Sequence, residues 1–438
     1  MIIDTLITAR WIIPVEPDGV TLEHHALAID RGRIADLLPT AEALVKYQPR
    51  RIERLEHHAL IPGLVNAHTH AAMTLLRGVA DDLPLMQWLQ KHIWPLEQKW
   101  IGEAFVRDGV QLAMAEMIRG GVTCFNDMYF FPEVVAREAA RAGMRAVVGM
   151  IVVDFPTAWA TDADEYLRKG LALRDDYRHE PLITTVFAPH APYTVSDEPL
   201  ARIRTWSEEL DCPVHIHLHE SAEEIHRSGQ QYGMRPLKRL DQLGLVGPHL
   251  IGVHMTQVED GEIARLAEAG ASVVHCPESN LKLASGFCPA AKLLAAGVNV
   301  ALGTDGAASN NDLDLLGETR TAALLAKAVA NDAAALPAHQ ALRMATLNGA
   351  AALGLAAETG SLTIGKAADV VAIGLEHIES LPIYNPISDL VYAAGRQQVT
   401  DVWVAGRQLL KKRELLTLDA TGIREKTLIW RDKLIHHS

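Results

Sequence analysis

The chain has little of what a disulfide-bonded, secreted or membrane protein needs. Its 438 residues include four cysteines, and no two of them form a CxxC pair. Neither a disulfide framework nor a cysteine-ligated zinc site is therefore indicated. No uncharged apolar run reaches roughly 18 residues, and no basic stretch precedes the first apolar residues, so we expect neither a membrane span nor a signal peptide. These absences favour a cytoplasmic protein.

Positive charge is also scarce. The chain has 41 Lys and Arg against 54 Asp and Glu, which gives a formal net charge of -13. Such a balance argues against nucleic acid or an anionic membrane surface as a partner. The GxGxxG, GxxxxGK[ST] and GxSxG motifs of nucleotide-binding proteins and serine hydrolases are missing as well. A small neutral or cationic substrate suits this composition. Whether the chain forms a homo-oligomer stays open.

Short β-rich runs with turn residues between them occupy both ends of the chain. They fill much of residues 1–56 and return at 368–373 and 399–406. We therefore predict that residues 1–56 and 357–438 together form one small β-sandwich domain. The closing His436-His437-Ser438 is either native or a remnant of an expression tag.

The segment between the ends, residues 57–356, alternates apolar strands with helical stretches rich in Ala, Leu, Glu and Arg. This alternation is typical of βα units around a parallel sheet. Helices are expected at 132–142 and 261–269, each followed by a glycine that suits a helix end. Eight strands are expected, at residues 60–68, 123–128, 145–153, 183–189, 214–219, 250–254, 272–276 and 298–305. Eight units favour an α/β fold of the (β/α)8 TIM-barrel type over a doubly wound sheet.

Histidine is abundant, with 20 residues, and several histidines stand at the expected strand ends. His68 and His70 are two positions apart on an extended segment, so their side chains point the same way. Other candidates at strand ends are His215, His217, His219, Glu220, His254 and Asp305. In a barrel these ends meet at one mouth. Imidazoles with one carboxylate suit a zinc-like divalent ion that keeps a position open for water, and iron(II) tolerates the same ligands.

The same residues resemble the amidohydrolase superfamily. The resemblance rests on residues 62–70 and on the contexts of His217, His254 and Asp305, and it covers essentially the whole chain. It implies a (β/α)8 barrel with a small β-sandwich from both termini. The resemblance also implies a metal site made by His68, His70, His217 and Asp305. Members of the superfamily with this pattern and no bridging lysine after the fourth strand hold one metal ion, and no lysine occurs at 183–194. The resemblance therefore implies one divalent ion, zinc in the first place and iron(II) in the second.

Longer stretches resemble the group of 5-methylthioadenosine/S-adenosylhomocysteine deaminases. They are residues 73–83, 280–286 and 302–311. The resemblance implies a hydrolytic aminohydrolase that replaces the amino group of an adenine ring and releases ammonia. Shorter versions occur in triazine hydrolases and guanine deaminases, so another N-heterocycle is the alternative substrate. A non-catalytic binding barrel is a third hypothesis, which the intact ligand set disfavours.

This resemblance also assigns catalytic roles. Glu220 would protonate ring nitrogen N1, and the His-x-x-Glu spacing selects His217 as ligand, with His215 deeper in the barrel and His219 at the rim. Asp305 would accept the water proton and pass it to the amino group. His254 would hydrogen-bond the nucleophile.

Substrate contacts are expected from the long segment 73–100, which covers the barrel mouth or packs on it as a helix. By resemblance, Trp88 forms an apolar wall, Glu97 accepts both ribose hydroxyls and His190 hydrogen-bonds the substrate. Members of the group that accept S-adenosylhomocysteine are expected to have arginines near the end of the third strand and in its loop. This chain departs from that pattern, because no basic residue occurs from position 148 until Arg168. A substrate carboxylate would lack its arginine partner there.

From this departure we expect 5'-methylthioadenosine, with adenosine, to be preferred over S-adenosylhomocysteine. Met150, on the third strand, would offer its soft apolar side chain to the thioether of that substrate.

Overall fold

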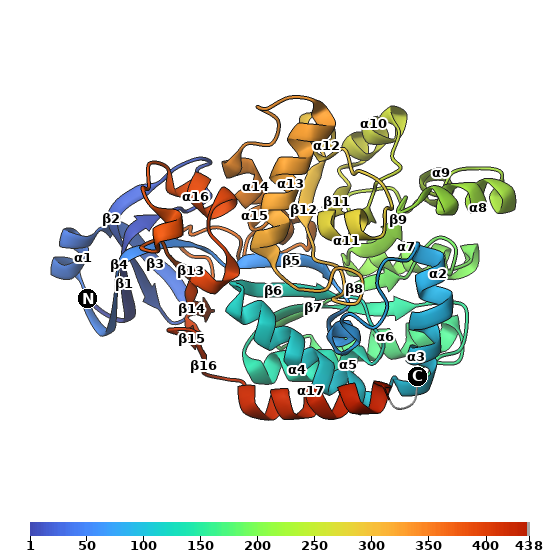
Figure 1. The fold of residues 1–438 in the computed structure, drawn as a ribbon, viewed down its shortest axis with the longest axis horizontal. Helices are drawn as coiled ribbons and strands as arrows, with labels where there is room; N and C mark the ends of the chain where they lie inside the picture. Colours follow the sequence, from blue (N-terminus) through green and yellow to red (C-terminus); the bar gives the residue numbers. More distant parts are fainter. Residues whose placement is uncertain (436–438) are drawn as a thin grey trace.

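The computed structural model describes residues 1–435, and the C-terminal His436-His437-Ser438 lies outside the described residues. Two eight-stranded sheets organise the chain: a parallel sheet rolled into a barrel, and a mixed sheet at one end of the molecule (Figure 1). The mixed sheet contains strands from both ends of the sequence, which appear as blue and red arrows side by side. The predicted α/β barrel with a terminal β domain is thus confirmed.

The barrel strands follow one another in chain order around the sheet. They are β5 (Leu64–Thr69), β6 (Val122–Asp127), β7 (Arg145–Val152), β8 (Ile183–Pro189), β9 (Val214–Leu218), β10 (Leu250–His254), β11 (Ser272–His275) and β12 (Asn299–Leu302). The ring closes where the chain after β12 meets β5, and the backbone N–H of Asp305 donates to the carbonyl of His68 at 3.1 Å. A doubly wound sheet has a reversal of strand order, so that alternative is wrong.

Gly303 permits this closure. A Cβ atom on Gly303 would lie 2.8 Å from the Cβ and 2.9 Å from the backbone nitrogen of His68. No side chain fits at such distances, and only glycine lets the two strands approach this closely. The closure brings the residues after β12 directly beside His68.

Side chains along the barrel strands alternate between the interior and the surrounding helices. The inward positions form a layer of small and branched side chains that includes Val65, Ala67, Cys124, Val147, Val186, Ile251, Val253, Val274 and Ala301. The outward positions, such as Val148 and Met150 on β7, belong to the larger core between the strands and the helices. The interior below the mouth is therefore filled, and only the C-terminal strand ends are free to form a site.

Helices follow the barrel strands as expected. Between β5 and β6 lie η1 (Ala71–Leu76), α2 (Leu85–Trp88), η2 (Leu89–Ile93), α3 (Trp94–Trp100) and α4 (Glu103–Arg119). The next helices are α5 (Pro132–Ala142), α6 (Ala163–Tyr177), α7 (Asp197–Leu210), α8 (Ala222–Tyr232), α9 (Pro236–Gln242) and α10 (Asp260–Ala269). After β11 and β12 come α11 (Pro277–Lys282), α12 (Ala290–Ala295), α13 (Leu315–Ala330), α14 (Ala338–Met344) and α15 (Leu347–Ala352). Gly143 and Gly270 end α5 and α10 with φ of 76° and 67°, which confirms the two helix ends predicted from glycine.

The terminal sheet has the order β16-β15-β14-β13-β4-β1-β2-β3. Its strands are β1 (Ile2–Ile12), β2 (Leu22–Asp30), β3 (Arg33–Pro39), β4 (Gln48–Pro62), β13 (Val370–Gly374), β14 (Val399–Val404), β15 (Arg407–Lys411) and β16 (Glu414–Leu415). The short helices of this part are α1 (Thr40–Lys46), η3 (Ile378–Ser380), α16 (Pro386–Tyr392) and η4 (Arg396–Gln398). β4 pairs in parallel with β1 and antiparallel with β13, so it joins the two ends of the sequence in one sheet.

Two features cross the expected domain limits. β4 carries the terminal sheet on to Pro62, so residues 60–62, expected in the first barrel strand, belong to the terminal sheet instead. The last helix, α17 (Ala420–Ile435), lies along α4 of the barrel (Figure 1). The division of the chain into a β domain of residues 1–56 with 357–438 and a barrel of residues 57–356 stays a proposal. Within residues 1–435, no helix has the length and apolar character needed to cross a lipid bilayer.

Candidate active site

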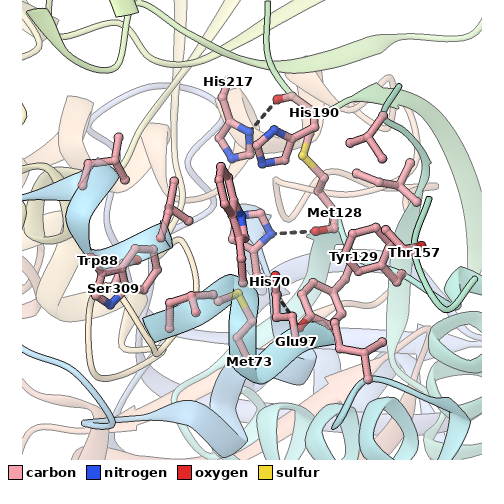
Figure 2. Close-up of a pocket in the computed structure, with 18 of the residues that line it drawn as sticks. His70, Met73, Trp88, Glu97, Met128, Tyr129, Thr157, His190, His217 and Ser309 are labelled. Carbon is pink, nitrogen blue, oxygen red and sulfur yellow. Dashed lines mark hydrogen bonds between the residues drawn. The ribbon is translucent and has the colours of Figure 1, made fainter. Parts of the chain in front are cut away.

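A cavity of about 640 Å³ opens at the C-terminal ends of the barrel strands. Its floor carries His70, His217, His254, Glu220 and Asp305 from the strand ends. Its walls come from α2, η2 and α3 on one side and from the loop after β7 on the other. Figure 2 shows His70 and His217 of the floor, with Trp88, Glu97 and Tyr129 around the same cavity.

Four side chains predicted as metal ligands converge at the floor. Nε2 of His68 lies 3.3 Å from Nε2 of His217 and 3.5 Å from Oδ1 of Asp305. Nε2 of His70 lies 3.3 Å from the same carboxylate oxygen. Four atoms bound tetrahedrally at about 2.0–2.1 Å from a zinc ion lie about 3.3 Å from one another, so each of these three spacings has the size expected between ligands of one ion. The side chains form two groups that share His68, one with His70 and Asp305 and the other with His217 and His254. The donor set also suits iron(II).

Backbone carbonyls fix how two of these rings are turned. Nδ1 of His70 donates to the carbonyl of Met128 at 2.6 Å, and Nδ1 of His217 donates to the carbonyl of His190 at 2.6 Å (Figure 2). A neutral ring that donates from Nδ1 keeps a lone pair on Nε2, the atom that faces the cluster. The arrangement therefore presents ligand atoms rather than N–H groups to a metal ion.

Burial keeps the imidazoles of His68 and His217 neutral. Desolvation lowers the pKa of His68 to about 4, although Asp305 acts in the opposite direction. Desolvation, together with His190 and His68, also holds the pKa of His217 well below its usual value. A metal ion binds the neutral form of histidine, so at neutral pH no proton has to be displaced from either ring.

Asp305 is held by hydroxyl groups as well as by the cluster. Ser279 and Ser309 donate to its Oδ2 at 2.6 and 2.9 Å, and the N–H of Gly306 donates to Oδ1 at 2.7 Å. Burial alone would raise the pKa of Asp305, but the hydrogen bond from His68 and the neighbouring histidines hold it well below the usual value. Its φ of 61° lies in the left-handed region, which is strained for a residue with a side chain and recurs at functional sites.

Glu220, just after the end of β9, also lies on the floor. It is 6 % exposed, and burial, with the negative charge of Asp305, raises its pKa to about 8. A carboxyl group in this state carries a proton at neutral pH and can donate it. Its backbone is fixed by Glu224 of α8, whose carboxylate accepts the N–H groups of Glu220 and His219 at 2.7 and 3.1 Å.

His254, at the end of β10, lies between the cluster and Glu220. Its Nδ1 donates to Oδ1 of Asn280 at 2.9 Å, and its Nε2 lies 3.9 Å from Oε1 of Glu220. One ring nitrogen also lies within 4.8 Å of ligand atoms of His68 and His217, so His254 can contribute to the metal site. Its φ of 77° is again in the left-handed region.

The predicted substrate contacts Trp88, Glu97 and His190 all line the cavity. Glu97, on α3, accepts a hydrogen bond from the hydroxyl of Tyr129 at 2.7 Å (Figure 2). Burial raises the pKa of Glu97 to about 7, while the hydrogen bond from Tyr129 lowers it. The carboxylate thus keeps acceptor positions that Tyr129 does not use.

Met150 does not line the cavity, so the prediction that it contacts a thioether is wrong. A Cβ atom on Gly170 of α6 would lie 2.8 Å from the Cβ of Met150, which shows that Met150 packs outward against that helix. Ile151 and Val153 of the same segment face the cavity instead. Met150 points away from the cavity because side chains alternate along a strand, so a residue next to the inward-facing Ile151 faces outward.

The two remaining histidines of β9 and its end are both buried. His215 lies below the cluster as expected, where its Nε2 is 2.8 Å from Nδ1 of His68. His219, expected at the rim, is 0 % exposed, and its Nε2 accepts the backbone N–H of Leu237 at 3.0 Å. The expected position of His219 is therefore wrong, because the chain turns at this residue with a φ of 53°.

Sequence reasoning missed the groups that hold the site residues in place. Ser279 and Ser309 hold Asp305, Asn280 orients His254, and Tyr129 bonds Glu97. Ser279 and Asn280 lie in α11, the helix that follows β11, so the rule that function gathers beyond the C-terminal strand ends would have indicated them.

Comparisons with known proteins agree with this geometry. The pattern of the "Amidohydrolase family" matches residues 59–409. A 5-methylthioadenosine/S-adenosylhomocysteine deaminase from Teredinibacter turnerae is 54% identical over 432 residues, which cover 99% of this chain and 98% of the relative. The crystal structure of an adenosine deaminase from Xanthomonas campestris with bound zinc has 56% identity and a TM-score of 0.98, covering 99% of both chains.

A more distant structure shares the fold alone. The atrazine chlorohydrolase from Arthrobacter aurescens, complexed with zinc, has a TM-score of 0.90 at 23% identity and covers 97% of this chain and 99% of its own. The family pattern spans most of the chain, and the Teredinibacter relative matches it almost from end to end. The chain therefore belongs to the amidohydrolase family.

Proposed function

We propose that the chain is a metal-dependent deaminase that converts 5'-methylthioadenosine, and adenosine, to the inosine analogue and ammonia. The observation that carries the proposal is one cavity that holds the histidine and aspartate cluster, the protonated Glu220 and the carboxylate of Glu97 together. The names of the relatives from Teredinibacter turnerae and Xanthomonas campestris support the same chemistry, since both are deaminases of adenine nucleosides.

His68, His70, His217 and Asp305 would hold one divalent ion, zinc in the first place, as in the Xanthomonas relative. When bound there, the ion supplies a water molecule whose pKa is lowered from about 15.7 toward about 7, which provides a nucleophile at neutral pH. The carboxylate of Asp305 is ionised and would accept a proton from the attacking water. The neutral Nε2 of His254 can accept a second hydrogen bond and so orient the nucleophile.

Glu220 then acts on the substrate ring. The amino-bearing carbon of adenine becomes tetrahedral when water adds, and negative charge would gather on ring nitrogen N1 unless a proton reached it. Glu220 is protonated at neutral pH and belongs to the floor, so it can donate this proton. Asp305 returns its proton to the amino group, which leaves as ammonia when the carbon–nitrogen bond breaks. The new hydroxyl on that carbon loses its proton as the carbonyl forms, and this proton restores Glu220. His190 at the wall offers a further hydrogen bond to the ring.

The upper part of the cavity fits an uncharged nucleoside. Glu97 can accept both ribose hydroxyls, and Trp88 closes one wall with an apolar ring. Among the described residues, no Lys or Arg lines the cavity, while Ile151, Val153 and Phe155 form the side near the loop after β7. The carboxylate of S-adenosylhomocysteine would therefore lose its hydration without gaining a cationic partner, which favours methylthioadenosine.

The alternative substrates are a triazine and guanine, neither of which has a ribose. The deciding experiment measures ammonia release and the ultraviolet change for methylthioadenosine, adenosine, S-adenosylhomocysteine, guanine and a chlorotriazine. We expect the two uncharged adenine nucleosides to give the highest kcat/KM. Activity confined to guanine or the triazine would overturn the proposal. A cytoplasmic location belongs to the same proposal, and light scattering would decide between a monomer and a homo-oligomer.

A further inference from the structure

We propose that Tyr129 is a positioning residue that sets the carboxylate of Glu97 for the ribose diol, an inference that rests on the proposed nucleoside function. Tyr129 is 4 % exposed, follows the end of β6, and donates its hydroxyl proton to Oε1 of Glu97 at 2.7 Å. Glu97 belongs to α3, in the segment that covers the mouth. The hydrogen bond therefore joins the covering segment to the barrel itself.

The bond leaves a defined part of the carboxylate available. A carboxylate has two oxygens with about four acceptor positions, and Tyr129 takes one of them on Oε1. Figure 2 shows Glu97 and Tyr129 meeting at the edge of the cavity, with their side chains turned toward each other. Two neighbouring hydroxyls need two acceptor positions in one plane, and a carboxylate that rotates freely does not hold them there.

The same loop also holds the metal cluster. The N–H of Met128 donates to the carbonyl of Thr69 at 3.0 Å, and the carbonyl of Met128 accepts Nδ1 of His70 at 2.6 Å. The next residue, Tyr129, holds Glu97. Two consecutive residues thus fix a metal ligand and the diol acceptor, so the distance between the metal site and the ribose subsite is set by a rigid piece of backbone.

The test compares substrates with and without the 2'-hydroxyl. In the Tyr129→Phe variant we expect KM for methylthioadenosine to rise about tenfold with kcat within about twofold, because one hydrogen bond to a charged group is lost at the binding site. For the 2'-deoxy analogue, KM should change less than about twofold, since that analogue has no diol to place. In a Glu97→Ala background, Tyr129→Phe should have no further effect.

Tyr47→Phe is the matched control. Tyr47 is also 4 % exposed and donates its hydroxyl to a carboxylate, that of Asp36, at 2.8 Å, but it lies in the terminal sheet domain. This variant should leave both KM values unchanged. Equal losses of Tyr129→Phe on the ribose and deoxyribose substrates would overturn the inference, and so would additive losses in the double variant.

Failure of the proposed function has a different signature. If the wild type binds methylthioadenosine in calorimetry without releasing ammonia, the deaminase proposal fails, and the ratio of binding constants for the two substrates still decides the role of Tyr129. A wild type that neither binds nor deaminates the nucleoside overturns both.

Discussion

Asn280 accepts the Nδ1 proton of His254 at 2.9 Å, and this bond turns Nε2 of His254 toward Glu220, 3.9 Å away. The two residues come from different βα units, α11 and β10. The orientation of His254 is therefore a tertiary property, and it places a neutral acceptor next to a protonated carboxyl group.

Replacing Asn280 with alanine should release the ring of His254. We expect kcat for methylthioadenosine to fall about 10- to 100-fold with little change in KM, because such orienting partners typically contribute that much. Steady-state kinetics checks this. Asn299→Ala is the control, since Asn299 lies at the start of β12, the opposite end of the barrel from the mouth. An unchanged kcat in Asn280→Ala would show that His254 needs no partner.

The metal site should depend on His217 more than on any exposed histidine. His217→Ala should lower bound metal from about one ion per chain to a small fraction and lower kcat/KM by at least about a thousandfold, because both the ligand and the activated water are lost. Elemental analysis of dialysed protein measures the first effect. His226→Ala, on the exposed face of α8, should retain its metal. Full metal content in His217→Ala would contradict the ligand assignment.

The affinity for ribonucleosides should depend on pH through Glu97. Burial raises its pKa to about 7, so the carboxylate that accepts two hydroxyls is present above that pH and is lost below it. KM for methylthioadenosine should therefore rise about tenfold per pH unit below 7. The hydrogen bond from Tyr129 lowers this pKa, so Tyr129→Phe should shift the midpoint to higher pH. A 2'-deoxy substrate serves as the reference, and an identical pH profile for it would rule out Glu97 as the titrating group.

A cation at the cavity edge should create activity on S-adenosylhomocysteine. Ala158, in the loop after β7, is exposed and lines the cavity, so an arginine there replaces little packing. Ala158→Arg should raise kcat/KM for S-adenosylhomocysteine about tenfold by a charge-assisted hydrogen bond, with methylthioadenosine changed less than about twofold. Ala158→Gln has similar length without charge and should not show the gain. A wild type that already prefers S-adenosylhomocysteine would refute the underlying argument.

Arg145 and Asp369 form a buried ion pair between the barrel and the terminal sheet domain. Nε of Arg145 lies 2.9 Å from Oδ2 of Asp369, and the two side chains are 3 % and 0 % exposed. Asp369→Ala leaves a buried charge unpaired, so we expect the free energy of unfolding to fall by about 3–5 kcal/mol. Urea unfolding measures the loss. Glu358→Ala, which breaks a partly exposed pair with Arg33, should lower it by less than about 1 kcal/mol. Equal effects of the two variants would contradict the role of burial.

The sequence predicts the barrel because its signals are local and repeated. Alternating strands and helices, and glycines such as Gly143 and Gly270, need no knowledge of distant contacts. The histidine and aspartate cluster is predictable for a related reason, because parallel strands bring their C-terminal ends to one mouth whatever the details. The structure accordingly places His68 within 4.8 Å of ligand atoms of His70 and Asp305 in one group and of His217 and His254 in another.

The sequence does not show where a strand begins within a continuous apolar run, or which of its side chains point inward. Residues 60–68 are apolar throughout their first half, yet the chain passes from the terminal sheet to the barrel at Gly63. In β7 both faces are buried, so no polar alternation tells which residues point inward, and the sequence-based prediction puts Met150 on the wrong side. The partners Asn280 and Tyr129 depend on contacts between separate βα units, which spacing along the chain does not encode.

The place of β13 between β4 and β14 has a consequence for synthesis of the chain. The barrel strands are all present once residue 302 has been made, whereas the edge of β4 has no neighbour on that side until residues 370–374 follow. An uncovered strand edge invites pairing with other chains, and domains tend to fold in the order in which they are translated. The last strands to emerge thus protect the first ones, and a ribosome stalled after the barrel would carry an enzyme core with an open edge.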